Sequence, residues 1–203
     1  MVTAIKNQKY TVEEYFELEL NSEERLEFWD GNVWSMAGAS PEHEQIVVNV
    51  GGHLRELLRG RKCSIFSSNL KILVPQYPPY RYPDLTVICG EGNYEMMGGM
   101  KVLINPQMIV EILSPSTEAF DRSDKFSYYQ SILSFTEYIM IAANRPKITQ
   151  LIKSNEGEWV QREGNGLDSG LHLPSFNIDI LLSEIYLGIE FPDPLANIRL
   201  VDR

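Results

Sequence analysis

The stretch MIVEIL, residues 108–113, is a run of apolar, strand-forming residues with one carboxylate inside it, Glu111. A stretch earlier in the chain, RYPDLTVIC at 81–89, has the same character and carries Asp84. Burying an unpaired carboxylate costs several kcal/mol or forces the group to take up a proton. An acid inside such a segment therefore usually has a partner, a metal ion or a chemical task.

Two such acids can share one site. Asp84 follows Pro83, which cannot donate a ladder hydrogen bond and favours the start or edge of a strand. Sequential strands are usually neighbours in a sheet, so we expect Asp84 and Glu111 to meet at one end of the sheet. Their oxygen atoms suit a hard cation such as Mg²⁺ or Mn²⁺, and Mg²⁺ takes only one or two protein carboxylates. The alternative is that each acid pairs with an Arg or Lys and only orders the sheet end.

A divalent cation at this place favours phosphodiester hydrolysis, because it neutralises charge and lowers the pKa of a bound water. A nearby lysine would stabilise the transition state. Two residues after Glu111 the chain has Leu113, which cannot do this. The next candidate is Lys125, in the helix expected to follow. The neighbouring acids Asp121 and Asp124 are interpreted as an ordinary helix start, where acids are favourable.

Further residues are candidates for supporting roles. Arg81 and Lys71 are the expected phosphate contacts. Glu27 is either a third, water-mediated ligand or the outward member of an alternating strand. His43 is either a neutral hydrogen-bonding group near the cleft or a surface residue. The tyrosines of YPPYRY, residues 77–82, either stack on bases or pack against a sheet edge.

Three early elements follow from local signals. A capping box, an Asp-Gly turn dipeptide and a Ser-Pro helix start mark them. They are a helix over 11–20, a hairpin with strands at 25–29 and 33–36, and a long amphipathic helix from 41 to about 59.

From residue 63 onward the pattern changes to strands. The expected strands are CSIFSS, NLKILVP, LTVIC, QMIVEIL, TEYIMIAA, a hairpin turning at 155–157 and a late strand near 171–173. The glycine- and methionine-rich segment 90–105 is expected to be a loop or an irregular excursion. A helix should begin after SPST, residues 114–117, and run through DKFSYYQSIL, and 180–185 should form a short closing helix. The apolar face of DKFSYYQSIL is predicted to consist of Phe126, Tyr129, Ile132 and Leu133.

The chain has the length of a single domain, residues 1–203. The order of elements predicts the α/β (α+β) class, with a central mixed sheet flanked by helices and an N-terminal helix and hairpin. The net charge of −10 repels polyanions. A nucleic-acid function therefore needs a local basic or metal-bearing cleft.

The cysteines and the lengths of the apolar runs indicate the cellular compartment to expect. Cys63 and Cys89 lack metal-ligand spacing and lie in strand-like contexts, so we expect reduced, buried thiols and a cytoplasmic protein. The N-terminus has no apolar signal region, and no apolar run approaches the roughly 20 residues of a membrane-spanning helix. Secretion and membrane insertion are not expected.

Taken in order, the motifs YPDLTVIC, MIVEILSPST, DRSDKFSYYQ and TEYIMI resemble the Uma-type endonuclease family, a branch of the restriction-endonuclease-like PD-(D/E)XK superfamily. The likeness extends over about residues 10–180 and includes LEFWDGNVWSMAGASPEH. It implies a central mixed four-stranded sheet with flanking helices. It also implies Asp84 as the first metal ligand, Glu111 as the second and Lys125 in the lysine role. The superfamily pattern expects that lysine at position 113, where this chain has Leu113.

The resulting hypothesis is a metal-dependent endonuclease. Asp84 and Glu111 would hold one Mg²⁺ or Mn²⁺ with help from the main-chain carbonyl of Ile112, and Lys125 would orient the attacking water. DNA is the substrate class that the resemblance implies. The rival is a catalytically inactive nucleic-acid- or protein-binding module that retains the fold, which the net charge and the displaced lysine favour. Cleaving both strands takes two active sites, so we expect a homodimer, with 185–195 as a partner surface or as a tail packed on its own domain.

Overall fold

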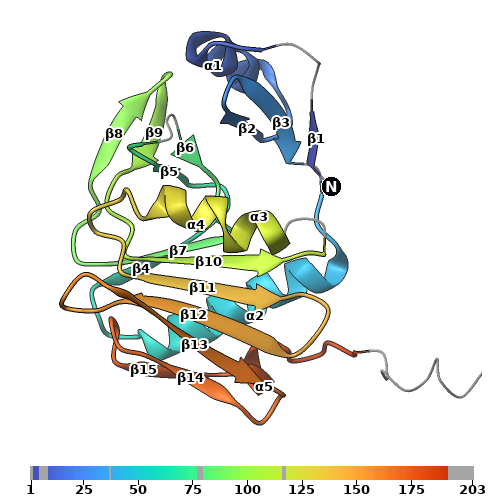
Figure 1. Ribbon diagram of the computed structural model, residues 1–203, viewed down its shortest axis with the longest axis vertical. Helices are drawn as coiled ribbons and strands as arrows, with labels where there is room; N and C mark the ends of the chain where they lie inside the picture. The colour runs from blue at the N-terminus through green and yellow to red at the C-terminus, as the bar shows by residue number, and fades with distance from the viewer. Residues whose placement is uncertain (1, 5–8, 37, 77–79, 116–117, 192–203) are drawn as a thin grey trace, which may run out of the picture.

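The stretch at 108–113 forms an inner strand of a six-stranded mixed sheet. The computed structural model describes residues 2–4, 9–36, 38–76, 80–115 and 118–191 (Figure 1). In spatial order the strands are β13 (Trp159–Asn165), β12 (Lys147–Lys153), β11 (Glu137–Ala142), β10 (Met108–Leu113), β7 (Leu85–Cys89) and β4 (Cys63–Ser67). β10 and β11 run parallel, and the other neighbouring pairs are antiparallel. The sheet is mixed, as expected, but has six strands rather than four.

All six residues of β10 are buried, because both faces of the sheet are covered. Met108, Val110 and Ile112 face a core shared with α2 (Pro41–Leu57), β14 (Gly170–Leu173), β15 (Ile178–Leu181) and α5 (Leu182–Ile185). Ile109 and Leu113 face a second core under α3 (Glu118–Arg122) and α4 (Asp124–Tyr129). Successive strand residues alternate between faces. Glu111 therefore points toward α3 and α4.

The N-terminal elements and a small second sheet lie together above the main sheet (Figure 1). The first group comprises β1 (Val2–Ala4), α1 (Val12–Asn21), β2 (Leu26–Trp29) and β3 (Asn32–Met36). The second sheet has the order β6 (Tyr80–Arg81), β5 (Lys71–Leu73), β9 (Met100–Leu103) and β8 (Tyr94–Met97). Leu26, Phe28 and Val33 of the hairpin pack with Tyr15 of α1 in a third core. This hairpin therefore carries its apolar face toward α1.

The predicted local signals are confirmed in this part of the chain. Thr11 caps α1 in a capping box with Glu14. Ser40 accepts a hydrogen bond at the start of α2, which begins with Pro41. Asp30 and Gly31 have φ angles of 46° and 75°, which a tight turn between β2 and β3 requires.

Three element predictions are wrong. Segment 90–105 contains the hairpin of β8 and β9, which turns at Gly98 and Gly99 with φ angles of 52° and 77°. The helix expected to begin after SPST and to run through DKFSYYQSIL is divided into α3 and α4 at Ser123 and ends at Tyr129, and Leu133 is 97% exposed. Residues 178–181 form a strand paired with β14, and only 182–185 are helical.

The predictions for the C-terminal stretch 185–195 and for the tyrosine-rich turn 77–82 can be checked only in part, because some of these residues lie outside the described ranges. Ile185 and Tyr186 are buried in the domain's own core, whereas 192–195 lie outside the described residues. Tyr80 and Tyr82 are buried and pack in the third core. Of the two alternatives for these tyrosines, packing inside the protein therefore holds, and base stacking does not. Tyr77 is outside the described residues.

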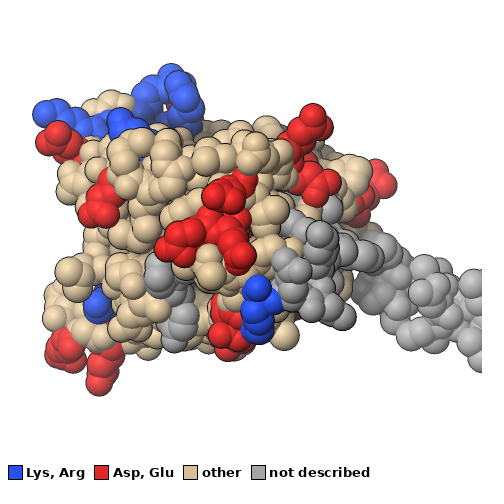
Figure 2. Space-filling model, turned by 90° about the horizontal axis from the view of Figure 1, so that it is seen from above, with Lys and Arg blue, Asp and Glu red and all other residues tan. Residues whose placement is uncertain are grey.

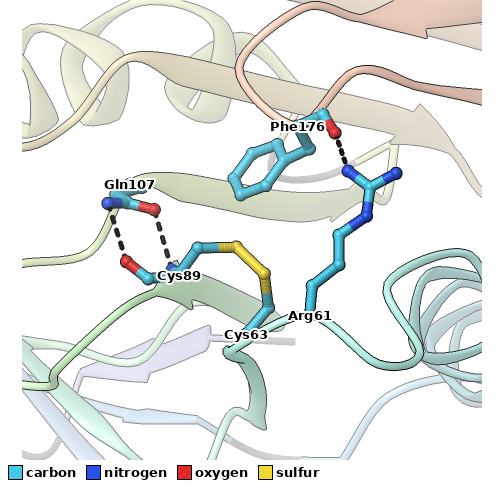
Figure 3. Close-up of a disulfide and its surroundings, with 5 residues drawn as sticks. All are labelled: Arg61, Cys63, Cys89, Gln107 and Phe176. Carbon is cyan, nitrogen blue, oxygen red and sulfur yellow. Dashed lines mark hydrogen bonds between the residues drawn. A yellow bond between two sulfur atoms is a disulfide. The ribbon is translucent and has the colours of Figure 1, made fainter.

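The expectation of two reduced thiols is wrong. Cys63 and Cys89 lie directly opposite each other on β4 and β7 and form a disulfide (Figure 3). The backbone N–H of Cys89 points to the other side, where it donates to Oε1 of Gln107 at 2.8 Å. The inference of a reducing compartment rested on free thiols and loses that support. No described helix is both long and apolar enough to cross a membrane.

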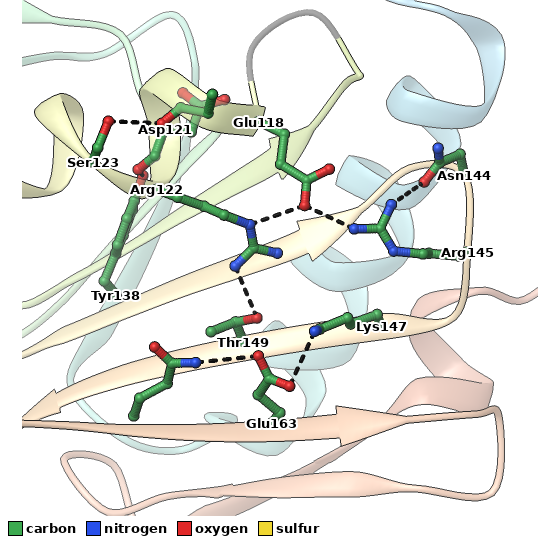
Figure 4. Close-up of polar contacts among 12 residues, drawn as sticks. Glu118, Asp121, Arg122, Ser123, Tyr138, Asn144, Arg145, Lys147, Thr149 and Glu163 are labelled. Atoms are coloured by element: carbon green, nitrogen blue, oxygen red, sulfur yellow. Dashed lines mark hydrogen bonds and ion pairs between the residues drawn. The ribbon is translucent and has the colours of Figure 1, made fainter.

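Ion pairs and a hydrogen bond join α3 to β12 and to the turn between β11 and β12 (Figure 4). The carboxylate of Glu118 accepts hydrogen bonds from Arg122 at 2.9 Å and Arg145 at 2.7 Å. Arg122 also donates to Thr149 at 3.2 Å. These contacts fix α3 on the sheet, and α3 carries Asp121 toward the site described next.

Candidate active site

The two predicted acids meet where β7 begins and β10 ends. The register Val110↔Leu85 places the next positions, Glu111 and Asp84, opposite each other. Oδ2 of Asp84 accepts a hydrogen bond from the backbone N–H of Ile112 at 2.7 Å. This contact fixes the Asp84 carboxylate beside the strand that carries Glu111.

Glu111 is buried and has two side-chain donors on one oxygen. Its Oε1 accepts from Nζ of Lys125 at 2.9 Å and from the hydroxyl of Tyr129 at 2.8 Å. Lys125 also lies 3.3 Å from Oδ1 of Asp121, one helical turn earlier in the chain. Lys125, Asp121 and Tyr129 are themselves buried. The structure thus brings Lys125 to Glu111, whereas Leu113 packs in the second core.

The electrostatics of this cluster follow from burial and from an excess of acids. Burial raises the pKa of Glu111 to about 8, repulsion from Asp84 and Asp121 adds to this, and the ammonium of Lys125 opposes it. Burial lowers the pKa of Lys125, but the charge of Glu111, together with those of Tyr129, Asp121 and Glu27, outweighs burial and the pKa is raised. Burial raises the pKa of Tyr129, as does Glu111, so its hydroxyl remains a donor.

The cluster opens into a cleft of about 1150 Å³ between the β2–β3 hairpin and the end of the main sheet. Residues from the hairpin, the start of α2, the end of β10 and helices α3 and α4 line it. Of the predicted site residues, six line this cleft: Glu27, His43, Arg81, Asp84, Glu111 and Lys125. The cleft is therefore the place where the sequence-based candidates converge.

His43 and Glu27 flank the acids. Nε2 of His43 lies 3.3 Å from Oδ2 of Asp84. Burial lowers the pKa of His43, but the hydrogen bond and charge of Asp84, together with the charges of Glu44 and Asp121, outweigh burial and the pKa is raised. Glu27 accepts a hydrogen bond from the backbone N–H of Tyr82 at 3.1 Å, and its charge helps to raise the pKa of Lys125.

Of the two predicted phosphate contacts, Arg81 lines the cleft and Lys71 does not. Arg81 is 1% exposed and donates to the carbonyl of Tyr80 at 2.9 Å, while its Nη2 has no hydrogen-bond partner among the described residues. A buried guanidinium N–H without a partner is costly, which indicates a place for an anion. Lys71 is not among the described residues that line the cleft. Its ammonium lies over the rings of Tyr80 and Tyr82, 3.7 Å from Glu19.

Sequence reasoning missed Asp121 and Tyr129 as site residues. Asp121 was interpreted as a helix-start acid and Tyr129 as part of an apolar helix face. A usable signal was present, because Asp121, Lys125 and Tyr129 are spaced four residues apart, which aligns polar groups on one helical face.

The donor set fits a hard divalent cation. The hydrogen bonds that described residues give to Asp84 fall on Oδ2, and those given to Glu111 fall on Oε1, so each carboxylate retains an oxygen for a ligand. Among the described residues there is no group of three His, Cys, Asp or Glu side chains that could hold a metal alone. Water would have to complete the coordination, which is usual for Mg²⁺.

Comparison with protein families and curated proteins gives consistent matches. The model of the family described as "Uma2: Putative restriction endonuclease" matches residues 12–183. "Uncharacterized protein slr1290" of Synechocystis sp. is 31% identical over 183 residues, covering 90% of this chain and 94% of that protein. "Uncharacterized protein sll1609" of the same organism is 29% identical over 163 residues, covering 80% and 92%.

A solved structure has a similar fold. It is described as a "putative nuclease belonging to DUF820 from Anabaena variabilis ATCC 29413" and superposes with a TM-score of 0.67 at 15% identity. The match covers 87% of this chain and 97% of that one. This likeness confirms the fold class predicted from the sequence, a mixed sheet flanked by helices.

Proposed function

The chain belongs to the Uma2 family of restriction-endonuclease-like proteins, and on that premise we propose that it is a metal-dependent endonuclease that hydrolyses phosphodiester bonds in DNA. The observation that carries the proposal is the convergence of Asp84, Glu111 and Lys125 at one end of the sheet, facing one cleft. Two acids and one lysine in that arrangement suit phosphodiester hydrolysis.

Each residue has a task in this proposal. A Mg²⁺ or Mn²⁺ ion held by Asp84 and Glu111 would neutralise charge on the phosphate and supply an activated water. Lys125, which the charges of Glu111 and the neighbouring acids keep protonated despite its burial, would orient the attacking water and stabilise the charge that develops on the phosphate. His43 holds the carboxylate of Asp84, and Arg81 offers Nη2 to a phosphate oxygen. The carbonyl of Ile112 as a further ligand, and Glu27 as a water-mediated one, stay predictions.

The proposal is tested by nicking of supercoiled plasmid with Mg²⁺ or Mn²⁺. The wild-type protein is expected to nick, and Asp84→Asn is expected to lose at least about a hundredfold in rate, because a metal ligand is removed. Asp124→Asn is the matched control, since Asp124 is exposed and close in sequence to Lys125 but does not line the cleft. Nicking that survives Asp84→Asn would contradict the mechanism.

The alternative is a catalytically inactive nucleic-acid- or protein-binding module that retains the fold. The net charge of −10 and Leu113 at the expected lysine position favour it. Calorimetric titration with Mn²⁺ separates the two: binding of Mn²⁺ that depends on Asp84, without nicking by the wild-type protein, would support the inactive module. The homodimer stays a prediction, to be checked by sedimentation.

A further inference from the structure

The β2–β3 hairpin turns an aromatic face toward the cleft. Leu26 and Phe28 point into the core with α1, so the alternate residues of β2, Glu27 and Trp29, point the other way. Trp34 of β3 is directly opposite Glu27 and therefore lies on the same face. Trp29 and Trp34 are diagonal neighbours on this face, and both line the cleft and are half-buried.

Trp29 is supported from one side by rings of the helical layer. Its ring centroid lies 5.3 Å from that of Phe120 and 5.7 Å from that of Tyr128. The guanidinium of Arg81 lies 5.8 Å from the centroid of the same Tyr128 ring. An aromatic surface and a buried cation, whose Nη2 has no partner in the part of the chain that the structure describes, therefore occur side by side at the site.

The charge of the cleft is unsuited to a long stretch of duplex. Seven of its described lining residues are Asp or Glu, and three are Lys or Arg. Duplex binding usually depends on neutralising phosphates of both strands with Lys and Arg. Glu42, Glu44 and Glu190 would repel phosphates that flank the site. Base stacking on aromatic side chains gives affinity without adding positive charge.

From this arrangement we propose that the cleft takes an unpaired nucleotide, in a single strand or a single-stranded segment, whose base stacks on Trp34 and Trp29 while Arg81 binds an adjacent phosphate. The cleft volume of about 1150 Å³ is close to that of small-ligand pockets, which suits one or a few unpaired nucleotides. This inference rests on the proposed nuclease function for the position of the scissile phosphate. It deepens that function by specifying the substrate class.

The test separates binding from cleavage. Fluorescence anisotropy with Ca²⁺ in place of Mg²⁺ would compare a short labelled DNA strand with the same strand annealed to its complement. The wild-type protein is expected to bind the single strand at least about tenfold more tightly, and Trp34→Ala is expected to lose about tenfold of that affinity. Its affinity for the duplex should not change.

Conservative variants show whether a loss reflects stacking or folding. Trp34→Phe keeps a ring in the hairpin and is expected to bind the single strand with intermediate affinity. The chain has three tryptophans, and Trp159 packs against Phe126 and Phe135 away from the cleft, so Trp159→Phe is the matched control. Quenching of tryptophan fluorescence by the single strand should persist in Trp159→Phe and shrink in Trp34→Phe.

Two results would overturn the inference: equal affinity for single strand and duplex, or unchanged single-strand affinity and quenching in both Trp34 variants. Plasmid nicking that remains normal in those variants would then show that the nuclease function stands without the aromatic site. Absence of nicking by the wild-type protein, with single-strand binding that depends on Trp34, would instead contradict only the nuclease function.

Discussion

Tyr129 links the hydrophobic core to the candidate site, because its fully buried ring carries the hydroxyl that donates to Glu111 at 2.8 Å. Tyr129→Phe removes this donor and keeps the ring. We expect the nicking rate to fall by about tenfold, as is typical when a partner of a metal ligand is lost. The free energy of unfolding should fall by about 1 kcal/mol.

The control for Tyr129 is Tyr186, another buried tyrosine. Its hydroxyl donates to the carbonyls of Ala142 at 2.8 Å and Lys147 at 2.9 Å. Tyr186→Phe should lose comparable stability in urea unfolding and keep the nicking rate. If both variants lose activity in proportion to stability, the hydroxyl of Tyr129 has no special part in the site.

The burial of Glu137, outside the candidate active site, leads us to expect that the stability of the protein depends on pH. It is fully buried, Gln150 donates to its Oε1 at 2.5 Å, and its Oε2 has no partner among the described residues. Burial raises the pKa of Glu137 above its usual 4.5. The unfolded chain therefore loses this proton first, and stability falls as pH rises from the unfolded pKa to the folded pKa.

The variant Glu137→Gln should not lose stability as the pH rises, because its side chain does not titrate. The amide also offers a donor for Oε1 of Gln150, which has no partner among the described residues. We expect the variant to be more stable than wild type by about 1 kcal/mol above the folded pKa and to show a flatter stability profile. Urea unfolding across the acid to neutral range measures this. Glu156→Gln, at an exposed turn position, should follow the wild-type profile.

At the residue scale the sequence indicated the acids better than their partners. Asp84 and Glu111 stand out because a carboxylate in an apolar strand is costly and therefore conspicuous. Tyr129 and Asp121 do not, since a tyrosine on an amphipathic helix and an acid at a helix start are ordinary. Lys71 was selected for its charge alone, and the structure directs it to Glu19 and two tyrosine rings.

At the scale of elements, features set by adjacent residues were predictable and features set by distant contacts were not. The capping box of α1 and the Asp30-Gly31 turn depend on a few neighbouring residues. The β8–β9 hairpin gains its place by pairing β9 with β5, and its exposed glycines and methionines resemble a loop. The disulfide likewise depends on the register that sets Cys63 opposite Cys89, 26 residues away.

The disulfide predicts how the edge of the main sheet responds to reduction. It joins edge strand β4 to β7 and closes a loop of 26 residues, for which chain entropy predicts a stabilisation of about 3.5 kcal/mol. Urea unfolding with and without a reductant should differ by that amount in wild type. The double variant Cys63→Ala, Cys89→Ala should be less stable and indifferent to the reductant. Two titratable thiols in the denatured, unreduced protein would contradict the bond.

At the scale of the whole molecule, the site exists only because two parts of the chain face each other. The main sheet supplies Asp84 and Glu111, and the N-terminal hairpin supplies Glu27 and Trp34 to the opposite wall of the same cleft. Their surroundings are acidic: Figure 2 shows a group of Asp and Glu near the centre of the face seen from above, with the largest group of Lys and Arg at the upper left. A polyanion therefore meets repulsion over much of the surface.

This charge predicts that DNA binding requires a divalent cation. With a net charge of −10, the metal-free protein should bind a single-stranded oligonucleotide weakly, and Ca²⁺ at constant ionic strength should raise the affinity by at least about tenfold, because the ion offsets the acids of the cleft. Asp84→Asn should abolish most of this gain. The exposed cations Arg59 and Lys62 lie outside the cleft. The double variant Arg59→Ala, Lys62→Ala should therefore show the same rise in affinity on addition of Ca²⁺ as the wild type. Tight, steeply salt-dependent binding without a cation, lost in that double variant, would place the DNA on a basic corner instead.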